Sequence, residues 1–190
     1  MTPARQPLGV CVYCGSRPGA HPSYEQQARA LGTALGQCDL PLVYGGGHVG
    51  MMGAIANAAL AAGGTAVGVI PRAMVEREWA HQGLSELLVV EDMHQRKATM
   101  AQRARCYVAL PGGFGTLEEL SETLSWAQLD FHQKPLFLLN VRGYFDPLLA
   151  FLDRCVGEHF ADTAHRQLLQ VTNSVDDLLA HPHFPAADHT

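Results

Sequence analysis

Six short apolar runs recur along the chain, and longer segments with helical spacing of their apolar residues separate them. The runs cover residues 8–14, 40–46, 65–71, 87–92, 106–113 and 135–141. Continuous apolar runs of this length, rich in branched residues, are typical of strands that are buried on both faces. Because these strands alternate with helices, we expect an α/β fold, namely a Rossmann-like open parallel sheet with helices on both faces.

Capping-box spacing indicates where three of the intervening helices begin. In such a box, the first side chain accepts a hydrogen bond from a helix N–H group that lacks a partner within the helix. The pairs are Ser23 with Gln26, Asp92 with Gln95, and Thr116 with Glu119. No internal repeat or low-complexity linker interrupts the chain, so residues 1–190 are expected to form a single domain, with residues 181–190 as a frayed tail.

Composition narrows the class of protein. The chain has 190 residues, of which 47% are apolar and 16% charged, and its formal net charge is −5. This balance argues against a broad basic surface, so neither nucleic acid nor an anionic membrane is an expected partner. No apolar segment reaches the roughly 18 residues of a membrane span, and the N-terminus has no apolar run long enough for a secretion signal. We expect a soluble, cytoplasmic protein.

The five cysteines do not suggest a disulfide framework, because their number is odd and some fall in strand-like runs. Cys11 and Cys14 form a C-x-x-C motif, but no second cysteine pair accompanies it. Zinc or redox use of this motif is the weaker alternative. We expect no metal and a reducing compartment.

Loops that follow the carboxyl ends of parallel strands are where ligands bind in an open sheet. After the first run, Ser16 and Arg17 suit phosphate or ribose oxygens, although a turn with a surface arginine explains them equally well. After the second run, the stretch that contains Gly46 and Gly47 reads GGGHVG, which fits G-x-G-x-x-G before a helix. No carboxylate for a second ribose follows before Glu76, so a mononucleotide fits this loop better than NAD.

A third glycine-rich loop, residues 109–119, joins a strand to a helix and lacks the G-K-[ST] of a Walker loop. Its residues Gly112, Gly113 and Gly115 allow backbone N–H groups to approach a phosphate closely. By spacing alone, Glu119 is more simply explained as the capping-box partner of Thr116 than as a functional carboxylate.

A helix expected from residue 92 places Arg96, Met100 and Arg103 along one face. Arg96 is either a surface charge or, if it reaches the cleft, a group that binds phosphate or orients a carboxylate. Lys97 and Lys134 are the only lysines. Neither lies in a recognisable pyridoxal phosphate motif, so no cofactor is expected.

Together these segments resemble the Lonely guy (LOG) family of cytokinin riboside 5′-monophosphate phosphoribohydrolases, some of which carry an older lysine decarboxylase label. The resemblance runs from about residue 10 to 152; its most specific parts are MHQRKATM and PGGFGTLEE, supported by VYCGSRPG, VYGGGHVGMMG and SWAQLDFHQKPLFLLNVRGYF. It implies that Arg96 and Glu119 are the catalytic pair, and that Gly113, Gly115 and Thr116 cradle a phosphate. The other implied substrate-binding positions are Ser16, Arg17, Gly46, Gly47, Glu78, Met93, Lys97, Gly112 and Ser125.

The same resemblance implies a nucleotide-binding domain that cleaves the N-glycosidic bond of purine (N6-substituted adenosine) 5′-monophosphates to free base and ribose 5-phosphate. In this hypothesis, Glu119 positions or deprotonates the attacking water, while Arg96 anchors the nucleotide and holds Glu119 ionised. Two alternatives stay open. One is AMP hydrolysis as the main role, and the other is a non-catalytic carrier of a nucleotide or of a molybdenum cofactor.

The resemblance also implies a homodimer, to which the helix after PGGFGT contributes. The apolar residues of that helix are Leu120, Leu124, Trp126 and Leu129. Apolar stripes on helices usually face the sheet, and this is the competing explanation for them.

Overall fold

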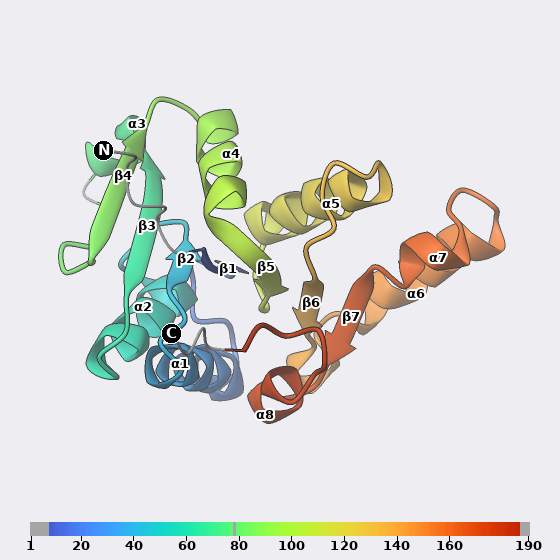
Figure 1. Cartoon of the computed structure of the whole chain (residues 1–190), viewed down its shortest axis with the longest axis horizontal. Coiled ribbons are helices and arrows are strands. Elements are labelled where there is room, and N and C mark those ends of the chain that lie inside the picture. Colours follow the sequence, from blue (N-terminus) through green and yellow to red (C-terminus); the bar gives the residue numbers. More distant parts are fainter. Residues whose placement is uncertain (1–7, 78, 187–190) are drawn as a thin grey trace.

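The computed structural model describes residues 8–77 and 79–186. Within this part of the chain, the strands are β1 (Gly9–Tyr13), β2 (Leu42–Tyr44), β3 (Ala66–Pro71), β4 (Glu86–Val90), β5 (Ala104–Ala109), β6 (Leu136–Leu139) and β7 (Leu169–Thr172). They form one parallel sheet in the spatial order β4-β3-β2-β1-β5-β6-β7 (Figure 1). The six predicted strands are thus confirmed.

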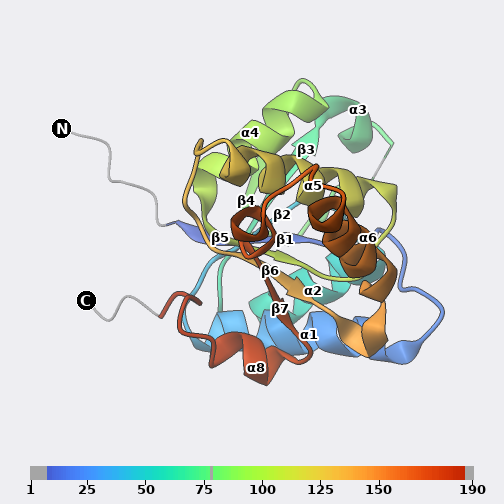
Figure 2. The ribbon, with the colours of Figure 1, turned by 90° about the vertical axis from the view of Figure 1, so that its right-hand side faces the viewer.

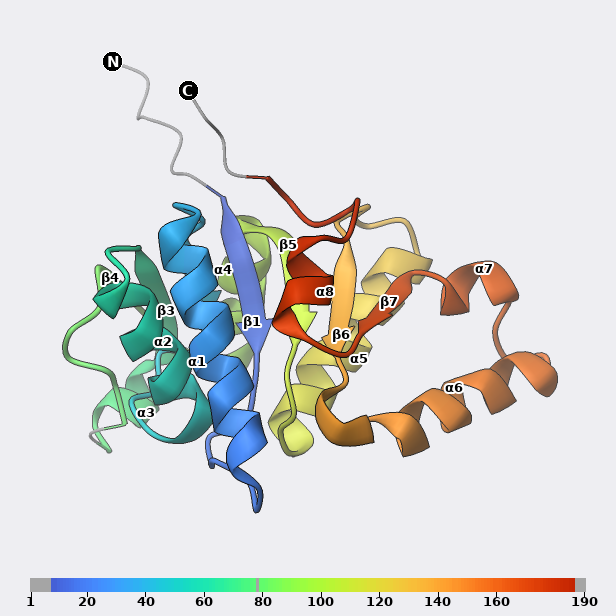
Figure 3. The same cartoon turned by 90° about the horizontal axis from the view of Figure 1, so that it is seen from below.

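Helices cover both faces of the sheet, which confirms the predicted fold class. Their bounds are α1 (Pro22–Gln37), α2 (Gly50–Ala61), α3 (Arg72–Val75), α4 (Met93–Arg103), α5 (Phe114–Gln128), the 3₁₀ helix η1 (Val141–Gly143), α6 (Asp146–Gly157), α7 (Thr163–Arg166) and α8 (Val175–Leu179). Figure 2 shows α1, α2 and α8 on one face and α4 and α5 on the other. In Figure 3, α6 and α7 extend beyond the edge strand β7.

Strand β7 was not predicted, and its sequence explains why. It pairs only with β6 among the described strands, and the residues of its LQVT sequence range from buried to exposed. It lacks the continuous apolar run by which the other strands, including the opposite edge strand β4, were recognised. None of the helices in the described part of the chain is long and apolar enough to cross a membrane.

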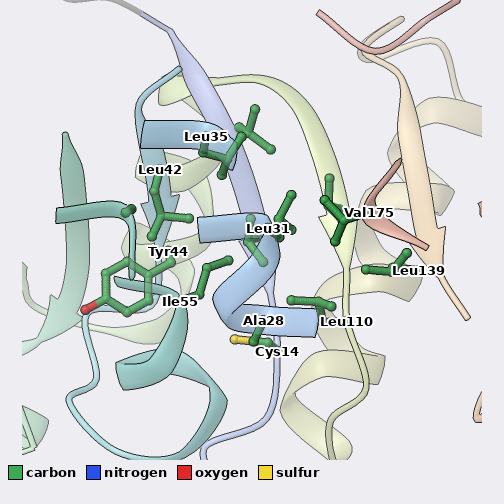
Figure 4. Packing of buried hydrophobic residues seen from close by; sticks show 14 of the residues in the cluster. Cys14, Ala28, Leu31, Leu35, Leu42, Tyr44, Ile55, Leu110, Leu139 and Val175 are labelled. Atoms are coloured by element: carbon green, nitrogen blue, oxygen red, sulfur yellow. The ribbon is translucent and has the colours of Figure 1, made fainter. Parts of the chain in front are cut away.

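Side chains that alternate along β1 enter two separate cores. Val10 and Val12 pack with α1 and α2, whereas Cys11 and Tyr13 pack on the opposite face. Figure 4 shows residues of the first core, in which Leu31 of α1 and Ile55 of α2 lie side by side. Cys14 lies in the first core and Cys11 in the second. Because the two sulfur atoms lie on opposite sides of the sheet, the C-x-x-C motif cannot form a disulfide or share a metal. Burial raises the pKa of both thiols above its usual value.

Two of the predicted helix starts are wrong, because the chain enters each helix earlier than the capping-box spacing suggests. The residue before α1 is His21, whose ring nitrogen Nδ1 accepts a hydrogen bond from the Ser23 N–H at 3.2 Å. Helix α5 begins at Phe114, and the residue that precedes it is Gly113, which has no capping side chain. Thr116 is therefore inside the helix, and Glu119 has no capping role.

The third predicted start is confirmed. Asp92 precedes α4 and its Oδ1 accepts a hydrogen bond from the Gln95 N–H at 2.8 Å. The amide oxygen of Gln95 in turn accepts from the N–H of Glu91, one residue earlier than in the usual box.

The first part of the tail is packed rather than frayed. Phe184 is buried, and its ring centroid lies 5.7 Å from that of Phe137 in β6. The ring of His181 contacts the same phenylalanine at 5.1 Å. Residues 187–190 lie outside the described part of the chain.

Candidate active site

The sheet order reverses between β1 and β5, and the loops that follow these two strands meet at this point. The N–H of Gly15 donates to the carbonyl of Pro111 at 3.1 Å, and the carbonyl of Gly15 accepts from the N–H of Met52 in α2 at 3.3 Å. These bonds join the loop after β1 to the loop after β5 and to the start of α2, which follows the GGGHVG loop. Such a reversal is where open α/β sheets bind their ligands.

Close backbone contacts require glycine at two positions in these loops. Gly50 has φ of +60°, and a Cβ there would lie 2.4 Å from the carbonyl atoms of Ser16. A Cβ on Gly112 would lie 2.0 Å from Oγ1 of Thr116 and 2.8 Å from the nitrogen of Gly15. Any larger residue at either position would push the loops apart.

Arg96 projects from the first turn of α4 toward the sheet and is only 8% exposed. Its Nε donates to the carbonyl of Val69 at 3.2 Å, and its Nη2 donates to the carbonyl of Gly45 at 3.3 Å. Nη1 lies 3.6 Å from the sulfur of Met93. The guanidinium is therefore fixed against β3 and against the residue that follows β2.

Glu119 projects from α5 toward this guanidinium and is also 8% exposed. Its Oε1 lies 3.9 Å from Nη2 of Arg96. Burial raises the pKa of the Glu119 carboxyl to about 7, although the positive charge of Arg96 acts in the opposite direction. The charge of Arg96 thus favours the ionised carboxylate, as expected, but the loss of water around the carboxylate has the larger effect.

The start of α5 leaves unoccupied space beside polar groups. A Cβ on Gly113 or on Gly115 would meet nothing within 4 Å. The hydroxyl of Thr116 is buried and has no hydrogen-bond partner among the described residues. The first N–H groups of a helix carry partial positive charge and attract anions, so Gly113, Gly115 and Thr116 at the start of α5 are a candidate anion cradle.

Four of the expected substrate-binding residues lie in the loops that follow β1 and β2. Ser16 and Arg17 are exposed on the loop after β1. Gly46, with φ of +75°, accepts a hydrogen bond at its carbonyl from the N–H of His81, and Gly47 pairs with Ala80 in an isolated bridge.

Two expected positions point elsewhere in the structure, and one cannot be placed. Lys97 forms ion pairs with Glu118 and with Glu122, the latter at 3.0 Å, so its ammonium group is directed at α5. Ser125 is exposed and donates a hydrogen bond to the carbonyl of Ser121; it lies about 9 Å beyond Glu119 along the helix axis. Glu78 lies outside the described residues.

Two polar features near the loops were not predicted from the sequence. Tyr144 donates a hydrogen bond from its hydroxyl to the carbonyl of Gly112; its only sequence signal was its place in LNVRGYF. A depression of about 550 Å³ is lined by His48, Asn57, Ala80, His81, Gln82 and Gly83. Arg96 and Glu119 do not line this depression. The candidate active site is therefore defined by the contacts between its residues and does not coincide with the depression.

A buried arginine–glutamate pair and a candidate anion cradle at the reversal of a parallel sheet are features that enzymes acting on phosphorylated ligands share. The family described as "Possible lysine decarboxylase" matches residues 52–181. A probable cytokinin riboside 5′-monophosphate phosphoribohydrolase of Oryza sativa subsp. japonica is 48% identical over 170 residues, which cover 90% of this chain and 69% of that protein. The corresponding enzyme of Rhodococcoides fascians is 47% identical over 92% of this chain and 88% of its own length. The chain therefore belongs to the LOG family of phosphoribohydrolases.

Solved structures with the same fold are more distant in sequence. The molybdenum cofactor binding protein from Rippkaea orientalis superposes with a TM-score of 0.70 at 20% identity, covering 92% of this chain and 95% of that one. The Moco carrier protein from Chlamydomonas reinhardtii gives 0.69 at 22% identity, covering 93% and 94%. At this identity the likeness shows a shared fold.

Proposed function

We propose that this protein is a hydrolase that cleaves the N-glycosidic bond of N6-substituted adenosine 5′-monophosphates, releasing free base and ribose 5-phosphate. The observation that carries the proposal is the Arg96–Glu119 pair, two buried and oppositely charged side chains 3.9 Å apart. A carrier needs a cradle for its ligand but has no need of a buried carboxylate with a pKa near neutrality. The relatives named above are phosphoribohydrolases.

Departure of a purine from ribose builds positive charge on the sugar, as in an oxocarbenium ion. A carboxylate near the anomeric carbon stabilises that charge, and it can also take a proton from the attacking water. Glu119 suits the second task, because a pKa of about 7 lets it accept a proton from water and release it again near neutral pH. Arg96 is held by two backbone carbonyls, so it presents a fixed charge to the carboxylate and to the nucleotide.

The 5′-phosphate is assigned to the start of α5. Gly113 and Gly115 leave room for it, and the unpartnered Thr116 hydroxyl supplies a hydrogen bond. The loop that carries Ser16 and Arg17 and the loop that carries Gly46 and Gly47 border the same reversal point, where they are placed to contact the ribose and the base. No catalytic cofactor is invoked, and in the described residues no group of three potential ligands could hold a metal ion.

The test is release of free base from AMP and from N6-isopentenyl AMP by wild type and by Glu119→Ala. Base release by wild type that disappears in the variant supports the hydrolase, and the ratio of the two rates shows whether plain AMP is the main substrate. Nucleotide binding without any base release would instead favour the carrier. That alternative is not better supported, because the carriers share the fold at 20–22% identity.

We also infer that the protein acts as a homodimer through the outer side of α5. Leu120 is buried and Leu124 packs against the sheet, so these two residues serve the core. Exposed apolar side chains nevertheless occur at both ends of the helix, namely Phe114, Leu117, Leu129 and Phe131. Such a surface favours a protein partner, and a second copy is the partner that the family resemblance implies.

The molar mass in solution tests the dimer. Leu129→Asp combined with Phe131→Asp should yield a monomer by light scattering, whereas Phe160→Asp, an equally apolar and 85% exposed position before α7, should not change the mass. A monomeric wild type would refute the dimer.

A cytoplasmic location is proposed on separate grounds: all five cysteines are free, which suits a reducing compartment.

A further inference from the structure

The side chain of Tyr144 reaches the third glycine loop from a different part of the sheet. Its hydroxyl donates a hydrogen bond to the carbonyl oxygen of Gly112 at 2.5 Å, the short end of the usual range. Tyr144 follows β6 and η1, whereas Gly112 follows β5. From the loop after β1, the N–H of Gly15 donates a hydrogen bond to the neighbouring carbonyl of Pro111. The loop is thus fixed from both sides.

The turn that presents Tyr144 adopts a costly backbone conformation. Arg142 has φ of 58° and Gly143 has φ of 67°, both in the left-handed region that disfavours a residue with a side chain. Buried Asn140 stabilises the turn: its amide nitrogen donates to Oδ1 of Asp146 at 2.7 Å, and its amide oxygen accepts from the N–H of Phe145 at 2.8 Å. Tyr144 therefore approaches the loop from a fixed direction.

The hydrogen bond from Tyr144 also sets the direction of the next N–H group, because the peptide unit is planar. In a trans peptide, the carbonyl of Gly112 and the N–H of Gly113 point in opposite directions. No described peptide bond is cis, so an oxygen held by Tyr144 directs the Gly113 N–H away from the tyrosine. That N–H has no partner among the described residues, and the space around Gly113 is open.

Glycines on both sides make this peptide unusually free to rotate. A rotated peptide would present the carbonyl oxygen of Gly112, a partial negative charge, where the N–H of Gly113 now lies. We propose that Tyr144 is a positioning residue for the phosphate cradle: its hydroxyl keeps the Gly112–Gly113 peptide in the orientation that offers an N–H group to the 5′-phosphate. The inference rests on the proposed function, which assigns this cradle to a phosphate.

Tyr24 supplies a matched control. Its ring lies edge-on to that of Tyr144, with centroids 5.7 Å apart, and it packs beneath Gly19 in the loop that carries Ser16. Its hydroxyl makes no hydrogen bond to any described residue. Tyr24→Phe and Tyr144→Phe therefore remove the same atom from adjacent rings, and only the second removes a contact with the loop.

The test is calorimetric titration of both variants with ribose 5-phosphate and with adenosine. Tyr144→Phe should raise the Kd for ribose 5-phosphate about tenfold, which corresponds to one hydrogen bond, whereas Tyr24→Phe should not change it. Adenosine carries no phosphate, so its Kd should be unchanged in both variants. In turnover, the KM for the nucleotide should rise by the same factor while kcat changes by less than about twofold, because a phosphate contact acts equally in the ground and transition states.

An unchanged Kd for ribose 5-phosphate in a Tyr144→Phe protein with a wild-type melting temperature would overturn the proposal. An equal loss of adenosine affinity would also overturn it, because it would indicate general loosening of the site. The titration requires no turnover. Absence of base release with intact ribose 5-phosphate binding would therefore contradict the proposed hydrolase alone. The role of Tyr144 would still be decided by the two Kd values for ribose 5-phosphate.

Discussion

Oε1 of Glu119 lies 3.9 Å from Nη2 of Arg96, and both side chains are almost completely buried. The two residues come from different helices, α5 and α4, and the guanidinium also donates hydrogen bonds to the carbonyl of Val69 in β3 and to that of Gly45, just after β2. The separation is longer than a direct hydrogen bond. The arginine therefore influences the carboxylate through its charge, and the carboxylate oxygens accept no hydrogen bond from the described residues.

The activity should rise with pH up to neutrality. If ionised Glu119 is the base, kcat/KM should increase through the pKa of about 7 and become constant above it. Initial rates between pH 5 and 9 measure this, and the second ionisation of the substrate phosphate, near pH ~6, must be separated from it. A rate that is constant between pH 6.5 and 8 would contradict the assignment of the base.

Removal of the charge of Arg96 should raise the pH at which kcat/KM reaches half of its maximum. Arg96→Gln takes away the one nearby positive charge that acts most strongly to lower the pKa of Glu119, so the midpoint of kcat/KM should shift above 7. The maximum rate should fall as well, because the nucleotide loses an anchor. A variant with a reduced rate and an unshifted midpoint would show that Arg96 has no electrostatic effect on Glu119.

Burial of Glu119 should make the folded protein less stable at high pH. Its pKa is raised from 4.5 to about 7 on folding, so its contribution to stability is fully present below about pH 4.5 and is lost as the pH rises through about 7. At about 1.4 kcal/mol for each pKa unit, the loss is roughly 3 kcal/mol in total. Urea unfolding at pH 5 and 8 should show this loss in wild type, and Glu119→Gln should be less sensitive to pH. Equal pH sensitivity in the two proteins would contradict the raised pKa.

Two glycines of the third loop should respond to alanine in opposite ways. Gly112→Ala places a Cβ 2.0 Å from Oγ1 of Thr116 and should destabilise the fold, by about 1–3 kcal/mol. Gly115→Ala has open space around it and lies inside α5, so it should stabilise the protein by about 0.5–1 kcal/mol. Its methyl group would nevertheless enter the cradle and weaken binding of ribose 5-phosphate. Unfolding curves and titrations of the two variants check this, and unweakened binding in Gly115→Ala would place the phosphate elsewhere.

The hydroxyl of Thr116 should serve the ligand and not the fold. It is buried without a partner, so Thr116→Val should leave the free energy of unfolding unchanged or raise it, by up to about 1 kcal/mol. The affinity for ribose 5-phosphate should fall by about tenfold. Thr172→Val is the control, because its hydroxyl is equally buried and unpartnered but lies at the end of β7. Equal affinity in both variants would exclude Thr116 from the cradle.

The sequence by itself determined the parallel α/β sheet, since buried strands require continuous apolar runs such as those of β1, β3 and β5. It also located the glycine loops, because close backbone approach at Gly50 and Gly112 excludes any side chain. The edge strand β7 escaped prediction because its half-exposed LQVT sequence lacks that pattern. Local spacing likewise mistook Thr116 for a cap, since a backbone-only helix start at Gly113 leaves no side-chain signature.

Only the tertiary structure decided the chemistry of the site. Arg96 and Glu119 are far apart in the chain, and their distance and burial depend on how α4 and α5 pack on one face of the sheet. The pKa of Glu119 follows from that packing, because the removal of water outweighs a charge that the sequence suggested would dominate. The contact of Tyr144 with Gly112 has the same origin: it requires β5 and β6 to be neighbours, which no local pattern of residues encodes.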